Sequence, residues 1–159
     1  MRRFLILTLP VFAVLLALDQ WVKITVEQYF ALGESLPLLP FFSLTYVRNT
    51  GAAWGMFSGA QLLLAFLGFT ACVLAVLFRK HFLGSKAIHD IVLGLLLSGI
   101  VGNLIDRLRL DYVVDFLHVH WNTWHFPCFN IADSAICVAA FCIIAFQFIP
   151  GLGPADSKK

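Results

Sequence analysis

The sequence predicts an all-α membrane protein in which four transmembrane helices carry a small β-sheet or hairpin on the outer side of the membrane. Residues of the A, V, I, L, M, F, W, Y and C types make up 60% of the 159 residues, and only 13% are charged. Soluble proteins average about 45–50% apolar and about 25% charged residues. A chain of this composition cannot cover its apolar surface with polar groups, so we expect lipid to cover it. We expect residues 1–159 to form a single integral-membrane domain.

Four apolar stretches approach the roughly 20 residues that a helix needs to cross a bilayer. The first follows Arg2 and Arg3, as a secretory signal would, but its end, LALDQWVK, lacks a small-residue cleavage site. We therefore interpret it as a retained span. The third carries Gly94, Ser98 and Gly102 at four-residue spacing, which predicts a face that another helix can approach closely. The four spans cover residues of about 4–22, 60–78, 88–105 and 131–149.

Basic residues predict the orientation of these spans. An even number of spans places both termini on one side, and seven lysines and arginines lie in the N-terminus, the 79–87 connector and the tail. Only four lie in the two opposite connectors, so the termini are expected to be cytoplasmic. Connectors 23–59 and 106–130 then face outward, and residues 150–159 form a short, disordered cytoplasmic tail. The net charge of +2, without a basic stripe, argues against a nucleic-acid partner.

The first outer connector contains a pattern typical of a strand. Residues 41–50, FFSLTYVRNT, alternate between large apolar and smaller or polar side chains before an Asn-Thr-Gly turn. We expect a short strand or hairpin on the outer surface of the membrane, with Trp54 and Phe57 at the depth of the lipid headgroups. The preceding residues 32–42 contain two prolines and are expected to form a loop or a short interfacial helix.

Polar side chains are costly near lipid, so each needs a physical reason. Asp19 and Lys23 are four residues apart at the outer end of the first span and can form an ion pair on one helix face. Asn103 and Arg107 have the same spacing at the outer end of the third span. Arg107 could extend to the lipid headgroups, or it could join Asn103 and Asp106 in a hydrogen-bonded cluster.

Two aspartates flank the second outer connector in contrasting surroundings. Asp115 stands within VVDFL, where poor solvation raises the pKa of a carboxyl group. Asp133 lies in the first turn of the fourth span, three residues after Asn130, a plausible N-cap. The helix dipole favours an acid there, so capping alone could explain Asp133. If the connector folds back, the two carboxyls could share one proton, which is how aspartic proteases activate water.

Other chemistries compete for the same region. His118, His120 and His125 could bind zinc or copper, or could be ordinary polar residues of an interfacial loop. Intramembrane acids also mark ion pathways, so a small ion-coupled transporter is a rival, and a metal-binding membrane protein is a second. A transporter is expected to place its ionisable groups near the bilayer midplane and often to show two similar halves. Here the polar residues gather at one face and no internal repeat is found, which favours an enzyme.

Five motifs together resemble one family of membrane proteases. The segments DQWVK, VRNTGAAWGMF, GNLIDR, VVDF and FNIADS occur in this order between Asp19 and Ser134. In this order they are similar to motifs of the lipoprotein signal peptidases, also called signal peptidase II.

The resemblance implies an aspartic endopeptidase of the bacterial cytoplasmic (inner) membrane, with its active site at the outer face. Such an enzyme removes signal peptides from diacylglyceryl-modified prolipoproteins, with membrane lipid around it. It implies no cofactor and no metal, and we expect a monomer. The resemblance assigns catalysis to Asp115 and Asp133. It assigns supporting roles, in substrate binding or in holding the pair, to Asp19, Lys23, Asn49, Asn103, Arg107 and Asn130.

Overall fold

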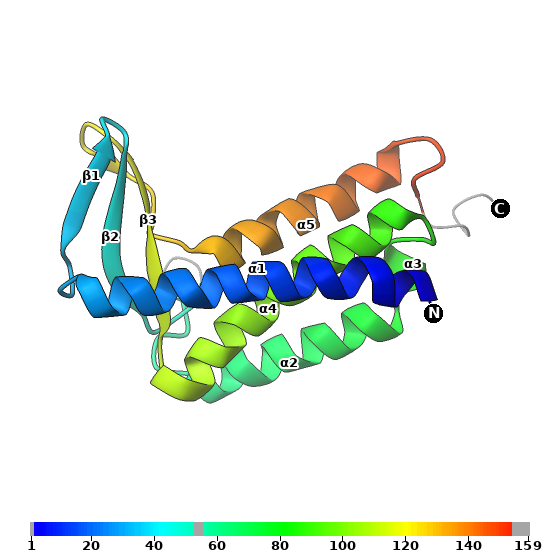
Figure 1. Cartoon of the computed structure of the whole chain (residues 1–159), viewed down its shortest axis with the longest axis horizontal. Helices are drawn as coiled ribbons and strands as arrows, with labels where there is room; N and C mark the ends of the chain where they lie inside the picture. The colour runs from blue at the N-terminus through cyan, green and yellow to red at the C-terminus, as the bar shows by residue number, and fades with distance from the viewer. Residues whose placement is uncertain (1, 53–55, 154–159) are drawn as a thin grey trace.

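Four antiparallel helices run along the long axis of the molecule, and a small sheet lies at one end of them (Figure 1). The structure is a computed structural model, and it describes residues 2–52 and 56–153. The helices are α1 (Arg2–Tyr29), α2 (Gln61–Leu77), α4 (Ala87–Leu110) and α5 (Ile131–Phe148), with a single turn, α3 (Arg79–Phe82), between α2 and α4. The start of α1 and the end of α5 both lie at the end of the bundle opposite the sheet.

The sheet is antiparallel, and its strand order follows the chain. It consists of β1 (Ser35–Leu39), β2 (Phe42–Asn49), β3 (Val113–Trp121) and the two-residue β4 (Trp124–His125). The buried residue Val26 of α1 packs with Tyr46, Val114 and Phe116 of the sheet, and these four residues form a core between the end of α1 and the sheet. The sheet therefore packs directly on the helix ends that carry the polar motifs.

Within the described residues, three helices are long and apolar enough to cross a membrane, by length and composition. They are α4, α5 and the Ile6–Tyr29 part of α1. The remaining predicted span, residues 60–78, corresponds to α2, which is apolar but only 17 residues long. A membrane protein with a small antiparallel sheet is thus confirmed, whereas a fourth crossing by α2 stays a prediction.

Small residues on α4 let its neighbours approach closely, as the sequence predicts. A Cβ atom on Gly94 would lie 2.8 Å from the Thr8 carbonyl oxygen of α1. A Cβ atom on Gly102 would lie 2.7 Å from the Asp19 carboxylate and 3.2 Å from the Cβ of Ala132 in α5. The central helix is therefore held against α1 and α5 by residues that have little or no side chain.

Several predicted boundaries differ from the observed ones. Helix α1 continues to Tyr29, so Lys23 lies within a helix and not in a connector. Residues 35–39, predicted to be a loop or short interfacial helix, form the edge strand β1 instead. The second outer connector contains β3, which pairs with β2. Trp54 and residues 154–159 of the predicted tail lie outside the described residues.

Candidate active site

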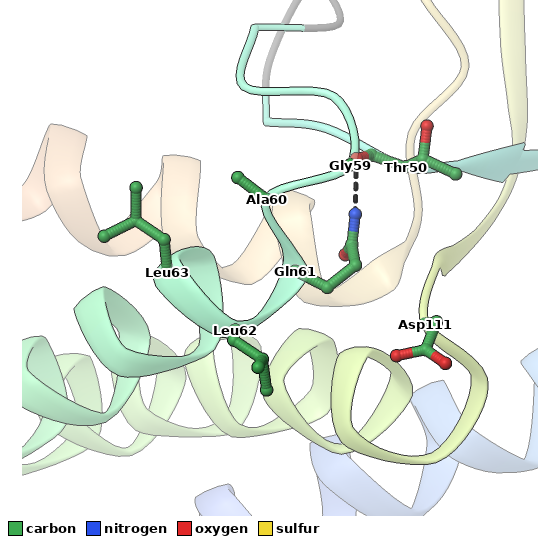
Figure 2. Close-up of a pocket in the computed structure, with 7 residues that line it drawn as sticks. All are labelled: Thr50, Gly59, Ala60, Gln61, Leu62, Leu63 and Asp111. Atoms are coloured by element: carbon green, nitrogen blue, oxygen red, sulfur yellow. Dashed lines mark hydrogen bonds between the residues drawn. The ribbon is translucent and has the colours of Figure 1, made fainter.

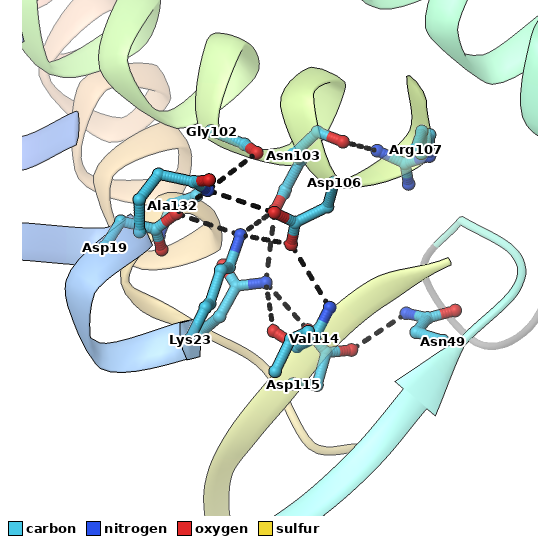
Figure 3. Close-up of polar contacts among 12 residues, drawn as sticks. Asp19, Lys23, Asn49, Gly102, Asn103, Asp106, Arg107, Val114, Asp115 and Ala132 are labelled. Carbon is cyan, nitrogen blue, oxygen red and sulfur yellow. Dashed lines mark hydrogen bonds and ion pairs between the residues drawn. The ribbon is translucent and has the colours of Figure 1, made fainter. Parts of the chain in front are cut away.

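A buried lysine organises the junction between the helices and the sheet (Figure 3). The Lys23 ammonium lies 2.9 Å from the carboxylates of both Asp19 and Asp106 and donates a hydrogen bond of 3.0 Å to Asn103 Oδ1. The side chains of Asp19, Lys23 and Asp106 are at most 2% exposed. The predicted ion pair of Asp19 and Lys23 is therefore present, but it lies inside the protein.

The two carboxylates that hold Lys23 also bind the backbone of the segments that follow. Asp19 Oδ1 accepts a hydrogen bond of 2.9 Å from the backbone N–H of Ala132, at the start of α5. Asp106 Oδ2 accepts one of 3.2 Å from the N–H of Val114, on β3. The charged group thus joins α1 and α4 to the two elements that carry the predicted catalytic aspartates.

Two asparagine side chains connect this charged group to those aspartates. Asn103 Oδ1 accepts hydrogen bonds from Lys23 and from Asn130 Nδ2, at 3.0 and 3.1 Å. The Asn103 amide is thereby oriented so that its Nδ2 donates to Asp133 Oδ1 at 2.6 Å. Asn130 Nδ2 also donates to Asp115 Oδ1 at 2.7 Å. A lysine that can only donate therefore determines which way the asparagine amides face.

Asp115 lies on β3 between the buried residues Val114 and Phe116 and is only 1% exposed. Its second oxygen accepts a hydrogen bond of 2.9 Å from Asn49 Nδ2, at the end of β2. Burial, and then the negative charge of Asp133, raise the pKa of Asp115 to about 7, against the opposing effect of the amide donors and Lys23. Asp115 can therefore keep its proton at near-neutral pH.

Asp133 lies in the first turn of α5 and is half-buried. Asn130 is the N-cap of this helix, as predicted: its Oδ1 accepts a hydrogen bond of 2.8 Å from the N–H of Asp133. In return, Asp133 Oδ2 accepts one of 3.2 Å from the N–H of Asn130. Together with the Asn103 amide, these donors and the positive end of the helix dipole stabilise a negative charge on the carboxylate, against the burial that opposes it.

Asn130 is the residue at which both aspartates meet. Its side-chain amide donates to Asp115, and its backbone N–H donates to Asp133. Arg107 closes the same region, because its guanidinium donates to the carbonyl oxygens of Asn103 and Gly51 at 3.3 and 3.1 Å. It therefore joins α4 to the turn that follows Asn49. All eight residues singled out in the sequence belong to one connected network.

Asp106 and Gln20 also belong to the network, but the sequence did not single them out as site residues. Gln20 Nε2 donates to Asp106 Oδ1 at 3.0 Å and, more weakly, to Asp19 Oδ2 and the Gly102 carbonyl at 3.3 Å. Asp106 follows Asn103 by three residues, a spacing that places both on one helix face. That spacing was the available signal for Asp106, whereas Gln20 offered none beyond its position next to Asp19.

A pocket lies at the start of α2, beside this network (Figure 2). Gln61 crosses it and donates a short hydrogen bond to the Thr50 carbonyl oxygen. Asp111 is the only titratable residue among those that line it, which are Thr50, Gly59, Ala60, Gln61, Leu62, Leu63 and Asp111. A pocket with a single acid does not supply a paired acid and base, so the chemistry is to be sought at Asp115 and Asp133.

Comparison with known proteins identifies the family. Residues 11–149 match the model of a protein family described as "Signal peptidase (SPase) II". The chain belongs to the signal peptidase II family. Signal peptidase II is an aspartic-type protease, and the three apolar helices agree with an integral protein of the bacterial inner membrane.

Curated relatives and solved structures agree with membership of the signal peptidase II family. The lipoprotein signal peptidase of Shewanella halifaxensis is 47% identical over 148 residues, which cover 89% of this chain and 84% of that protein. That of Syntrophotalea carbinolica is 40% identical over 140 residues, which cover 86% and 87%. A solved structure of a bacterial membrane enzyme is 29% identical and superposes with a TM-score of 0.80, covering 89% of this chain and 87% of the other.

Proposed function

We propose that this chain is a lipoprotein signal peptidase whose catalytic pair is Asp115 and Asp133. Its substrates would be prolipoproteins, because the curated relatives are named lipoprotein signal peptidases. The motif resemblance implies that these substrates carry a diacylglyceryl group. The observation that supports the proposal most is the convergence of the two carboxyls on Asn130 from separate elements, β3 and α5. Two acids that meet in a poorly solvated site favour a shared proton.

In the proposed reaction the two aspartates divide the proton transfers. Asp133 is ionised and removes a proton from a water molecule, whose oxygen attacks the carbonyl carbon of the scissile peptide bond. Asp115 is protonated and gives its proton to the leaving nitrogen as the C–N bond breaks. The proton that Asp133 took from water then passes to Asp115, so that Asp133 is again ionised and Asp115 is again protonated. The raised pKa of Asp115 and the donors around Asp133 support this assignment.

The remaining network residues are proposed to position the catalytic pair. Asn130 and Asn103 would fix the orientation of the carboxyl groups, with Lys23, Asp19 and Asp106 holding Asn103 in place. Asn49 would hold Asp115 from the sheet side. Arg107 would fix the adjoining turn through the Gly51 carbonyl. A network of hydrogen-bond donors with fixed directions favours a single arrangement of the Asp115 and Asp133 carboxyl groups.

The site is proposed to lie at the outer face of the membrane, with both termini in the cytoplasm. Two observations support this orientation: the excess of basic residues near the termini, and the position of the sheet at the end of the bundle opposite the start of α1 and the end of α5. The signal helix of the substrate would enter sideways from lipid, which places its lipid-modified cysteine at the depth of the aspartates. We infer that the enzyme acts as a monomer with lipid around its helices.

The experiment replaces each aspartate separately by asparagine and measures cleavage of a diacylglyceryl-modified precursor peptide by the purified full chain. Asparagine keeps the shape of the side chain but can neither take up nor release the proton. We expect Asp115→Asn and Asp133→Asn each to lose at least about 100-fold in kcat.

Asp111→Asn is the matched control, because Asp111 is an exposed aspartate at the end of α4. Its backbone has a φ of 60°, a conformation that asparagine also tolerates. Wild-type activity is expected for this variant. Retained cleavage by a folded Asp115→Asn or Asp133→Asn variant would reject the assignment of the catalytic pair.

A further inference from the structure

Three histidines gather on one face of the sheet, outside the network of the candidate active site. His118 and His120 are two residues apart on β3, so their side chains share a face. His125 on β4 is the cross-strand partner of His120. The ring centre of His118 lies 5.2 Å from the ring centre of His120 and 5.2 Å from that of His125. The ring centres of His120 and His125 are 5.8 Å apart.

The distances between the ring centres are close to those of three imidazoles arranged around a single metal ion. Zinc binds histidine nitrogen at about 2.0–2.1 Å with tetrahedral angles, which places neighbouring donor nitrogens about 3.4 Å apart and the ring centres roughly 5 Å apart. His118 Nε2 and His125 Nδ1 are joined by a hydrogen bond of 3.1 Å, and a metal ion would replace the proton between them. Two donor atoms and three ring positions are therefore near the geometry that a metal requires.

Hydroxyl groups of β2 hold the opposite nitrogens of two of these rings. His118 Nδ1 lies 3.3 Å from Thr45 Oγ1, and His120 Nε2 lies 2.9 Å from Ser43 Oγ. Thr45 is in turn fixed by a hydrogen bond of 2.8 Å with Ser35 on β1. Metal-binding histidines characteristically have their second ring nitrogen held in this way, which sets the tautomer and the orientation of the ring.

His125 is exposed and the other two rings are half-buried, so an ion could reach the cluster from solvent.

The donor nitrogens of the three histidines do not yet converge on one point in the structure. Within residues 2–52 and 56–153, no group of three or more His, Cys, Asp or Glu side chains is arranged to hold a metal ion. His120 directs its Nε2 to Ser43, so it would have to offer Nδ1 to an ion shared with His118 and His125. Small side-chain rotations would bring the three donors together, because the ring centres already have nearly the required separation.

We propose that His118, His120 and His125 form a binding site for a divalent transition-metal ion, with Zn²⁺ as the probe ion. The three rings would supply three ligands and leave the fourth position to water. Bound metal would join β4 to β3 and so fix the outer end of the sheet. The proposal does not depend on the proposed peptidase activity.

The test measures Zn²⁺ binding to the purified full chain in detergent by isothermal titration calorimetry, after removal of any histidine tag. One Zn²⁺ per chain is expected for the wild type. His118→Ala, His120→Ala and His125→Ala are each expected to weaken binding by more than about 100-fold, because each removes a ligand. His125 is exposed, so its variant should fold normally.

His81→Ala is the matched control, since it removes an exposed imidazole of α3 far from the cluster in the chain, and it should bind like the wild type. Thr45→Val removes the hydroxyl that holds Nδ1 of His118 in place. This variant should bind Zn²⁺ about tenfold more weakly than the wild type. Absence of Zn²⁺ binding by the wild type, or unchanged binding in the three histidine variants, would overturn the proposal. Because the readout is binding, either result leaves the proposed proteolysis to its own test.

Discussion

At the scale of single residues, Lys23 shows how strongly the site depends on one charge. Its ammonium group is buried and holds two carboxylates and an amide oxygen within 3.0 Å. Removing one member of a buried ion pair leaves an uncompensated charge, which is far more costly than losing a surface pair. In this network the uncompensated groups would be the carboxylates of Asp19 and Asp106.

Replacing Lys23 by methionine tests this dependence. We expect Lys23→Met to lower the free energy of unfolding by about 3–5 kcal/mol, because it leaves buried carboxylates unpaired. Denaturant unfolding of the purified chain in detergent measures the change. Lys80→Met removes an exposed lysine of α3 and should change stability by less than about 0.5 kcal/mol. Equal stability of the two variants would contradict a central role for Lys23.

The sequence predicts individual site residues better than it predicts their contacts. The N-cap role of Asn130 and the pairing of Asp19 with Lys23 follow from spacings of three and four residues, which are local. The bond of Asn130 to Asp115 joins residues across a connector, so no spacing could predict it. The sequence placed Asp106 beside Asn103 and Arg107, but its ion pair with Lys23 could not be predicted for the same reason, since Lys23 lies on another helix.

At the scale of elements, α4 is the centre of the bundle, and its glycines set how closely its neighbours pack. A Cβ on Gly94 would lie 2.8 Å from the Thr8 carbonyl oxygen and 2.9 Å from the Cβ of Val11. Backbone cannot yield as a flexible side chain can, so α1 would have to move. The network residues on α1 and α4 depend on this contact distance.

A pair of glycine-to-alanine variants separates packing from helix propensity. Gly94→Ala should destabilise the chain by about 1–3 kcal/mol, because the added methyl group overpacks the interface with α1. Gly68→Ala on α2 meets only Ile100 Cγ2, at 3.5 Å, and should be neutral or stabilising by up to about 1 kcal/mol through helix propensity. Thermal unfolding in detergent compares them. A Gly94→Ala variant as stable as Gly68→Ala would refute close packing of α1 on α4.

The strands show where a pattern in the sequence stops being informative. The alternating residues 41–50 contain β2 (Phe42–Asn49), as expected, although the pairing of β2 with β3 contains a register shift. All five residues of β1 are exposed, and it contains Pro37, which an edge strand tolerates. In β3 the residues Val113–Phe116 are all buried, so no alternation marks them as a strand. Neither strand could be recognised from a period of two residues.

At the scale of the whole molecule, the polar network lies at one end of the helices, where the sheet packs on them. An ion-coupled transporter would be expected to place such groups near the middle of its spans. The composition and motif order predicted a membrane protein with an outer sheet, because apolar length and positive charge are properties of whole segments. The meeting of β3 with the start of α5 depends on how these segments pack, and it is this meeting that brings Asp115 and Asp133 together.

The pH dependence of kcat/KM on a diacylglyceryl-modified precursor peptide tests the central claim most directly, namely that Asp115 and Asp133 share one proton. A carboxyl with a raised pKa is protonated below that pKa and loses its proton above it. With the pKa of Asp115 at about 7, kcat/KM should fall about tenfold per unit above roughly pH 7, as both carboxyls become ionised. It should also fall at low pH, where Asp133 becomes protonated. A value that stays constant from about pH 6 to about pH 9, in a chain that remains folded, would contradict the shared proton.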